Sequence, residues 1–254
     1  MIAFISDIHS NLPALDAALA DIHAQGIKRI VCLGDIVGYG GSPLETIERV
    51  QETCELSLKG NHDEVLMREG MANYFNAWAR DAIMWTKDQV DASDQMADLY
   101  DFFYSLKAEE LFISETGKKL KLVHASPRDP LTEYLLPNLT PDGAVLRANF
   151  DILREGPRIC FYGHTHHPGY FQPGESFLPA KDGDTLEIVE GDYYLINVGS
   201  VGQPRDRNPQ LSYVILEGDI VHWRRVDYDI ALAQETIVAA GLPQKLSDRL
   251  AIGR

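Results

Sequence analysis

The chain contains short apolar runs that each end in polar side chains, and this pattern constrains its fold more than any other feature. The first runs, at residues 2–6, 29–33 and 54–58, have the length and composition of buried strands. The segments between them are predicted to be helices. Strands alternating with helices predict an α/β fold with parallel pairing. Because ligands in such folds bind at the carboxyl ends of the strands, the polar residues there are candidates for one site.

Length and composition predict one folded domain over residues 1–254. The hydrophobic content of 45% and the charged content of 24% are ordinary for a globular protein of 254 residues. We expect this domain to carry a helical insertion at about residues 64–110 and a loop and helix segment at about 127–155. No run is long enough to span a membrane, no signal peptide is evident, and the three cysteines lack CxxC spacing, so we expect a cytoplasmic protein.

The formal net charge of -15 limits the partners of this chain. Nucleic acids and anionic lipids are bound through lysine and arginine, and no segment supplies a basic stripe. We therefore expect no stable binding of nucleic acid and no membrane association. A small phosphate-containing ligand would have to be attracted by a local positive centre.

The same periodicities predict the rest of the secondary structure. After about residue 170 the chain is mainly β-rich, and helix-forming segments precede and follow that part. The predicted helices are 12–26, 43–52, 141–155 and 230–240, and the predicted strands are 111–114, 119–123, 158–162, 185–189, 193–198, 211–216 and 219–226.

Aromatic residues recur at helical spacing in the insertion, for example Tyr74, Phe75, Trp78 and Phe103. Such a stripe usually packs into the core, and this is the interpretation we favour. The alternative is that part of it lines a substrate pocket. Since the insertion follows a polar strand end, it is also a candidate cap over the site.

The stretch Gly60-Asn61-His62-Asp63 places an amide, an imidazole and a carboxylate directly after a strand-like run. Glycine permits a sharp turn, so these side chains can converge at the strand end. Taken alone, the stretch is equally typical of a polar turn that caps the following helix. Its companions at the other strand ends favour the functional interpretation.

Histidine, aspartate or asparagine side chains follow five of the predicted strand ends. Each residue alone has an ordinary explanation as a turn, capping or core residue, but their joint occurrence at successive strand ends favours one site. Imidazole, carboxylate and amide ligands suit two borderline divalent metals among Mn, Fe, Co, Ni and Zn, which the sequence does not rank. The residues are Asp7, His9, Asp35, Asn61, His62, Asp63, His124, His164 and His166.

These residues form ordered motifs that resemble the calcineurin-like metallophosphoesterases. The resemblance implies a four-layer αββα sandwich, in which helices flank two mixed sheets, with a dimetal centre at the strand ends. The matching motifs are Asp7-Ile8-His9, Gly34-Asp35-Ile36-Val37-Gly38, Gly60-Asn61-His62-Asp63, His124 and Gly163-His164-Thr165-His166.

The resemblance also implies a division of the ligands between the metals. One metal would take Asp7, His9 and His166. The other would take Asn61, His124 and His164, with Asp35 bridging both. The chain departs from the family's protein phosphatases, which have Asp-Arg-Gly where this chain has Gly38-Tyr39-Gly40 and Glu where it has Asp63. It looks more like the small prokaryotic phosphodiesterase branch.

The implied activity is metal-dependent hydrolysis of phosphodiester bonds by in-line attack of a dimetal-bridging hydroxide. His62 would be the general acid and Asp63 would hold its ring, while Asn61, His62 and Arg205 would bind the substrate, a small phosphate ester such as a nucleotide. Arg205 could instead pair with Asp206. The alternatives are a phosphomonoesterase, a protein or nucleotide phosphatase of the same fold, or a non-catalytic interaction scaffold. The sequence predicts no oligomeric state.

Overall fold

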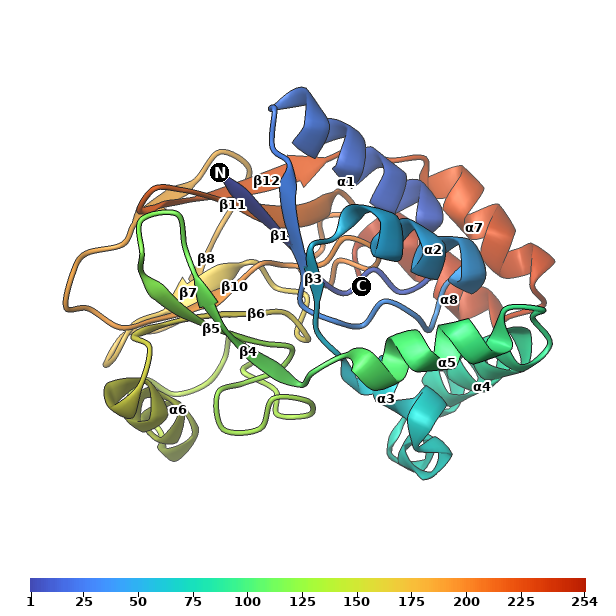
Figure 1. Ribbon diagram of the computed structural model, residues 1–254, viewed down its shortest axis with the longest axis horizontal. Helices are drawn as coiled ribbons and strands as arrows, with labels where there is room; N and C mark the ends of the chain where they lie inside the picture. The colour runs from blue at the N-terminus through green and yellow to red at the C-terminus, as the bar shows by residue number, and fades with distance from the viewer.

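The computed structural model describes residues 1–254 and contains two six-stranded sheets (Figure 1). The first sheet has the strand order β3-β2-β1-β11-β12-β9. Its β1, β2 and β3 are parallel, whereas β11 is antiparallel to β1, so the sheet is mixed. The strands are β1 (Ile2–Ile5), β2 (Arg29–Cys32), β3 (Leu56–Ser57), β9 (Thr185–Glu187), β11 (Leu211–Glu217) and β12 (Ile220–Val226).

The second sheet has the order β4-β5-β6-β10-β7-β8 and is mixed as well. Its centre is the parallel set β5, β6 and β10, and β4 and β7 add antiparallel neighbours. The strands are β4 (Glu109–Ile113), β5 (Lys119–Val123), β6 (Ile159–Tyr162), β7 (Gly169–Phe171), β8 (Leu178–Pro179) and β10 (Tyr194–Asn197).

Helices cover the outer face of each sheet. The apolar faces of α1 (Leu12–Ala24) and α2 (Pro43–Thr53) pack with residues of β1, β2 and β11, and α6 (Ala144–Glu155) packs on the second sheet from the opposite side (Figure 1). This arrangement confirms the predicted αββα sandwich. The other helices are α3 (Asn61–Met67), η1 (Glu69–Tyr74), α4 (Ala77–Asp91), α5 (Met96–Ser105), α7 (Ile230–Ala239), α8 (Gln244–Asp248) and η2 (Arg249–Ile252). None of the helices is both long and apolar enough to cross a membrane.

An apolar layer joins the two sheets. The rings of Phe4 on β1 and Phe161 on β6 stack with their centroids 4.5 Å apart. Trp223 is 1% exposed, and its indole N–H donates to the backbone oxygen of Asn197 at 3.0 Å. Burying one such aromatic side chain stabilises the fold by roughly 1.5–3 kcal/mol. The layer holds the carboxyl ends of β1, β2, β5 and β6 at a common edge.

Several predicted boundaries were wrong. The third strand is confined to Leu56–Ser57, and the helix predicted from residue 141 begins at Ala144. Asp142 has a left-handed φ of 55° and Gly143 is the N-cap, so the helix cannot start earlier. The short strands β7 and β8 and the helices α8 and η2 carry too few residues for a periodic signal and were not predicted.

The helical segment predicted through residue 110 ends at Ser105, and the strand β4 begins at Glu109. Its aromatic stripe follows neither interpretation throughout. Phe103 is fully buried and belongs to the core, whereas Tyr74 is 88% exposed. Phe75 takes a third position, because its ring lies against the ring of His62 with centroids 4.5 Å apart.

Asp21 on α1 ties the helix to the first sheet, and we expect Asp21→Asn to weaken that link. Its carboxylate accepts hydrogen bonds from Tyr213 on β11 and Arg224 on β12. Burial alone would raise the pKa of Asp21, but these bonds lower it below its ordinary value of 3.8. A lowered folded-state pKa means that the carboxylate stabilises the fold above pH 3.8 and loses this effect as the pH falls through the folded-state value.

The expected loss for Asp21→Asn at pH 7 is about 1.5–3 kcal/mol, the usual contribution of hydrogen bonds to a charged group. Urea unfolding at pH 7 and pH 3 measures it, with the exposed Asp94→Asn as control. The difference from wild type should shrink at pH 3. A difference of equal size at both pH values would contradict the assignment.

Candidate metal centre

The seven predicted metal ligands converge at the common edge of the two sheets. They come from the loops after β1, β2, β5 and β6 and from the start of α3. All are buried, and the most exposed, Asn61, is only 6% accessible. The ligands are Asp7, His9, Asp35, Asn61, His124, His164 and His166.

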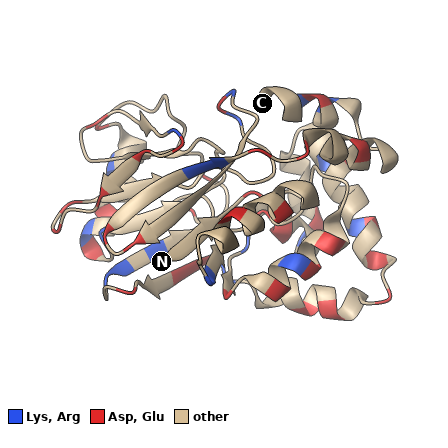
Figure 2. Cartoon of the chain, turned by 90° about the horizontal axis from the view of Figure 1, so that it is seen from above, with Lys and Arg blue, Asp and Glu red and all other residues tan.

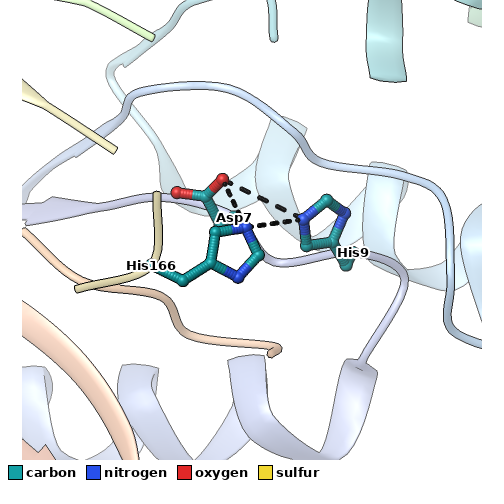
Figure 3. Close-up of side chains that lie close together, drawn as sticks. All are labelled: Asp7, His9 and His166. Atoms are coloured by element: carbon teal, nitrogen blue, oxygen red, sulfur yellow. Dashed lines mark hydrogen bonds and ion pairs between the residues drawn. The ribbon is translucent and has the colours of Figure 1, made fainter. Parts of the chain in front are cut away.

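Asp7, His9 and His166 form the first group (Figure 3). The Nε2 atom of His166 lies 3.1 Å from Asp7 Oδ1 and 3.3 Å from His9 Nε2. The third separation, from His9 Nε2 to Asp7 Oδ1, is 3.9 Å. Ligands about 2.0–2.2 Å from one tetrahedral ion would be roughly 3.4 Å apart. The group therefore has the size of a metal site.

Asp35, His124 and His164 form a second group of the same kind. The Nε2 atom of His124 is 3.2 Å from His164 Nδ1, 3.3 Å from Asp35 Oδ2 and 3.2 Å from the amide oxygen of Asn61. The amide oxygen of Asn61 and the three ligand atoms of this group thus lie near one another around His124.

Asp35 lies between the two groups. Its Oδ2 atom is 3.7 Å from His9 Nε2 in the first group and 3.3 Å from His124 Nε2 in the second. Its Oδ1 atom accepts a hydrogen bond of 2.8 Å from the backbone N–H of His62, which fixes the carboxylate. The position is the one that a bridging ligand would need.

Backbone carbonyls orient the histidine rings. The Nδ1 atom of His9 is 3.1 Å from the oxygen of Val37, and that of His124 is 3.0 Å from the oxygen of Leu33. A ring nitrogen that donates to a carbonyl leaves the other nitrogen as a lone-pair ligand. The Nδ1 atom of His166 contacts the backbone oxygen of Gln203. The Nε2 atom of His164 contacts that of Thr132, which leaves its Nδ1 free to bind a metal.

The protonation states of the buried histidines in both ligand groups also suit metal ions. Burial lowers the pKa of His9 well below its ordinary value and that of His164 to about 3, so both rings are neutral ligands at pH 7. For His124, burial alone would lower the pKa, but the charge and hydrogen bond of Asp35 and the nearby carboxylates together raise it to about 9. The Oδ1 atom of Asp7 is buried without a hydrogen-bond partner. A cation would satisfy that oxygen and replace the proton of His124.

Backbone strain is concentrated at the ligands. Five of them have left-handed φ angles between 52° and 61°. Non-glycine residues in that region cost of order 1–3 kcal/mol each and persist where the surrounding structure fixes them, typically at functional sites. The sequence carried no signal for this strain. The residues are Asp7, His9, Asp35, His164 and His166.

Gly60 and Asp63 act differently from the prediction. Gly60 has an ordinary extended φ of −92°, but a Cβ there would overlap the carboxylate of Asp35. Asp63 does not hold the ring of His62. It accepts hydrogen bonds from the backbone N–H groups of Ile36 at 3.0 Å and Gly60 at 2.9 Å, and it lies in the first turn of α3. Asp63 therefore fixes the loops that carry Asp35 and His62.

We expect Gly60→Ala to displace Asp35 and to weaken metal binding. Overpacking of this kind costs about 1–3 kcal/mol. Urea unfolding and manganese titration measure the two effects. Gly70→Ala is the matched control, because nothing lies within 4 Å of a Cβ at Gly70. Equal metal affinities for the two variants would show that the glycine does not protect the position of Asp35.

His62 is buried beside the first group. Its ring packs against the rings of His9, Tyr39 and Phe75 at centroid distances of 4.9, 4.6 and 4.5 Å. Its Nδ1 atom has no hydrogen-bond partner. Burial lowers the pKa of His62 to about 4.

Arg205 does not form the ion pair with Asp206 that was the alternative to substrate binding. Asp206 instead pairs with Arg225. A guanidinium nitrogen of Arg205 donates to the side-chain oxygen of Gln203 at 3.0 Å and lies 3.5 Å from the hydroxyl of Tyr39. Its charge also lowers the pKa of His62 and His166, both of which burial lowers more strongly. Arg205 thus faces the candidate centre.

Two aromatic residues beside the centre were not predicted as site residues. Tyr39 belongs to the Gly38-Tyr39-Gly40 sequence, where the departure from the phosphatase pattern was a signal for it. Tyr134 lies in the segment predicted as loop, and its ring centroid is 4.0 Å from that of His164. Nothing in the sequence around Tyr134 indicated this contact.

A family model described as the calcineurin-like phosphoesterase superfamily domain matches residues 1–219. The chain belongs to this superfamily. Membership supports a hydrolase, and the superfamily depends on divalent metals. The histidine and aspartate groups described above could hold such ions.

Individual relatives agree with this assignment. The chain is 42% identical over 259 residues to an uncharacterized protein of Methanocaldococcus jannaschii, with 100% of this chain and 98% of the relative covered. The crystal structure of a metallophosphoesterase from Sphaerobacter thermophilus is 36% identical, has a TM-score of 0.83 and matches over 100% of this chain and 99% of that one. A hypothetical protein from Pyrococcus horikoshii shares the fold, with 18% identity, a TM-score of 0.75 and coverage of 100% and 98%.

Proposed function

We propose that this member of the superfamily hydrolyses phosphodiester bonds at a centre of two divalent transition-metal ions, with Mn, Fe, Co, Ni and Zn as candidates. The observation that supports this most strongly is the placement of Asp35 between two groups of buried ligands (Figure 3 shows the first of them). When bound, such ions supply a nucleophile from water at neutral pH and stabilise the charge that develops on phosphoryl oxygens.

The residues of the chain would bind the metals and the substrate and protonate the leaving group. Asp7, His9 and His166 would hold one metal, and Asn61, His124 and His164 the other, with Asp35 between them. Asn61 would also donate to a phosphate oxygen. His62 would protonate the leaving alkoxide as general acid. Its ring is neutral in the free protein because burial lowers its pKa to about 4. The negative charge of a bound phosphate acts in the opposite direction and favours uptake of the proton.

The preference for diesters rests on the cations at the site. Arg205 is the arginine whose charge acts on His62 and His166. One arginine suits the single charge of a diester, whereas a dianionic monoester would favour a second cation at the scissile phosphate. Phosphomonoester hydrolysis is the second candidate, because Arg249 lies near Arg205, as described below.

The proposed substrate is a small molecule, and a nucleotide ester would fit this description. Figure 2 shows basic residues scattered mostly singly among more numerous acidic ones, in agreement with a net charge of -15. This distribution supports the expectation that nucleic acid is not a stable partner.

Hydrolysis of bis(4-nitrophenyl) phosphate and 4-nitrophenyl phosphate tests the proposal. The protein is stripped of metal, and Mn, Ni, Zn or Mg is added back separately. We expect faster hydrolysis of the diester, and only with a transition metal. A preference for the monoester would favour the second candidate. Metal binding without hydrolysis of either ester would favour a non-catalytic scaffold.

A further inference from the structure

Two arginines near the metal centre are only partly exposed and lack an acidic side chain as partner. Neither Arg205 nor Arg249 forms an ion pair with Asp or Glu, and both are only partly exposed. Every other lysine or arginine is either exposed or ion-paired; even the buried Arg225 pairs with Asp206. In a chain with 38 acidic residues and 23 basic ones, two such arginines require an explanation.

Both guanidinium groups lie near the ring of Tyr39. The central carbon of Arg205 lies 5.7 Å from the centroid of Tyr39, and that of Arg249 lies 5.6 Å from it. The same ring contacts His9 and His62 at centroid distances of 4.7 and 4.6 Å. Arg249 comes from η2 near residue 250, far from the metal motifs in sequence. The pair therefore adjoins the centre on the side of His62.

No aspartate or glutamate side chain pairs with either guanidinium group. The Nε atom of Arg205 is buried and has no hydrogen-bond partner, and the Nε atom of Arg249 donates to the backbone oxygen of Arg254. Burial and the charge of Arg205 lower the pKa of Arg249 to about 10. Two like charges beside one ring, both partly removed from solvent, are unfavourable unless an anion lies close to them. Arginine forks match the oxygens of phosphate and carboxylate groups.

We propose that Arg205 and Arg249 form a second anion subsite, so that the preferred substrate carries a further phosphate or carboxylate beside its scissile phosphodiester. This inference deepens the proposed function and rests on it for the identity of the scissile group. Tyr39 would be the platform that spaces the subsite from the metals. The subsite would make the enzyme prefer such a substrate over simple diesters, whose only charge lies at the metals.

A matched pair of substrates tests the subsite: thymidine 5′-(4-nitrophenyl phosphate), with and without a 3′-phosphate. We expect kcat/KM to be on the order of 10-fold higher with the 3′-phosphate, as for a charge-assisted contact. In Arg249→Met this ratio should fall to about 1, and Arg249→Lys, which keeps the charge, should retain part of it. Arg147→Met, at an exposed arginine of α6 without an ion pair, is the control and should keep the wild-type ratio. Thermal unfolding checks that each variant folds.

A ratio that stays at the wild-type value in Arg249→Met, even with lower overall activity, would overturn the subsite. A preference of wild type for the ester without the 3′-phosphate would overturn it as well. An equal loss on both esters, together with a larger loss on 4-nitrophenyl phosphate, would assign the arginines to the scissile phosphate instead.

Calorimetric binding to manganese-loaded protein separates this inference from the proposed function. Thymidine 3′,5′-bisphosphate should bind more tightly than thymidine 5′-monophosphate, and Arg249→Met should remove the difference. If this holds while neither ester is hydrolysed, the subsite stands and the proposed activity fails. Equal binding of the two nucleotides would overturn the subsite whether or not diesters are hydrolysed.

Discussion

Replacing Asp35 with asparagine is expected to lower phosphodiester turnover roughly 1,000-fold, the upper range for losing one key electrostatic contact. The carboxylate lies within 3.7 Å of a histidine nitrogen in each ligand group, so it is the residue best placed to act on two ions at once. Asparagine keeps the size and one oxygen but loses the negative charge. Metal content measured by mass spectrometry should fall below two ions per chain, together with the activity.

The exposed Asp94→Asn is the control for this variant, because it changes the net charge by the same amount. Asp35→Asn protein that retains two ions and wild-type turnover would refute the bridging role. Loss of activity in an unfolded variant would not support the bridging role, so circular dichroism accompanies both measurements.

His62→Ala is expected to lower turnover of an alkyl-leaving diester about 100- to 10,000-fold, the usual contribution of general acid catalysis. An aryl diester with a 4-nitrophenolate leaving group should be affected much less, because that group departs without a proton. The contrast between the two esters is the measurement, with metal content as a second readout. The second readout matters because a nitrogen of His62 lies within 4.8 Å of ligand atoms of His9 and Asp35.

Equal losses of turnover on both esters with unchanged metal content would refute the role of His62 as general acid. A loss of metal in His62→Ala would make His62 a ligand instead. Phe75→Leu is a useful companion, since it removes the ring that packs on His62 and keeps the imidazole. We expect it to affect the alkyl-leaving ester more than the aryl ester, because it loosens the position of the acid.

The sequence was sufficient for the sandwich and for the set of side chains that converge. Buried parallel strands such as β1 and β2 give continuous apolar runs, and their polar ends must meet at one edge of a sheet. Asp35 follows β2 of the first sheet, whereas His124 and His164 follow β5 and β6 of the second, so their grouping with Asp35 rested on the resemblance to a known family. Strand ends are local features that the fold class brings together.

Other features depend on contacts that no local pattern encodes. The need for glycine at position 60 comes from the neighbouring Asp35, and the carboxylate of Asp63 turned out to hold backbone amides and not the ring of His62. Arg249 lies in a short helix without a motif and reaches the site only through its contact with Tyr39. Such features require the tertiary structure, because their partners are distant in the chain.

Anomalous diffraction from manganese-soaked crystals tests the central claim most directly. The account predicts two manganese peaks about 3.5–4 Å apart, the spacing of two-metal sites. One peak should lie among Asp7, His9 and His166, and the other among Asn61, His124 and His164, with Asp35 touching both. A single peak, or peaks outside these two groups, would contradict the two-metal account.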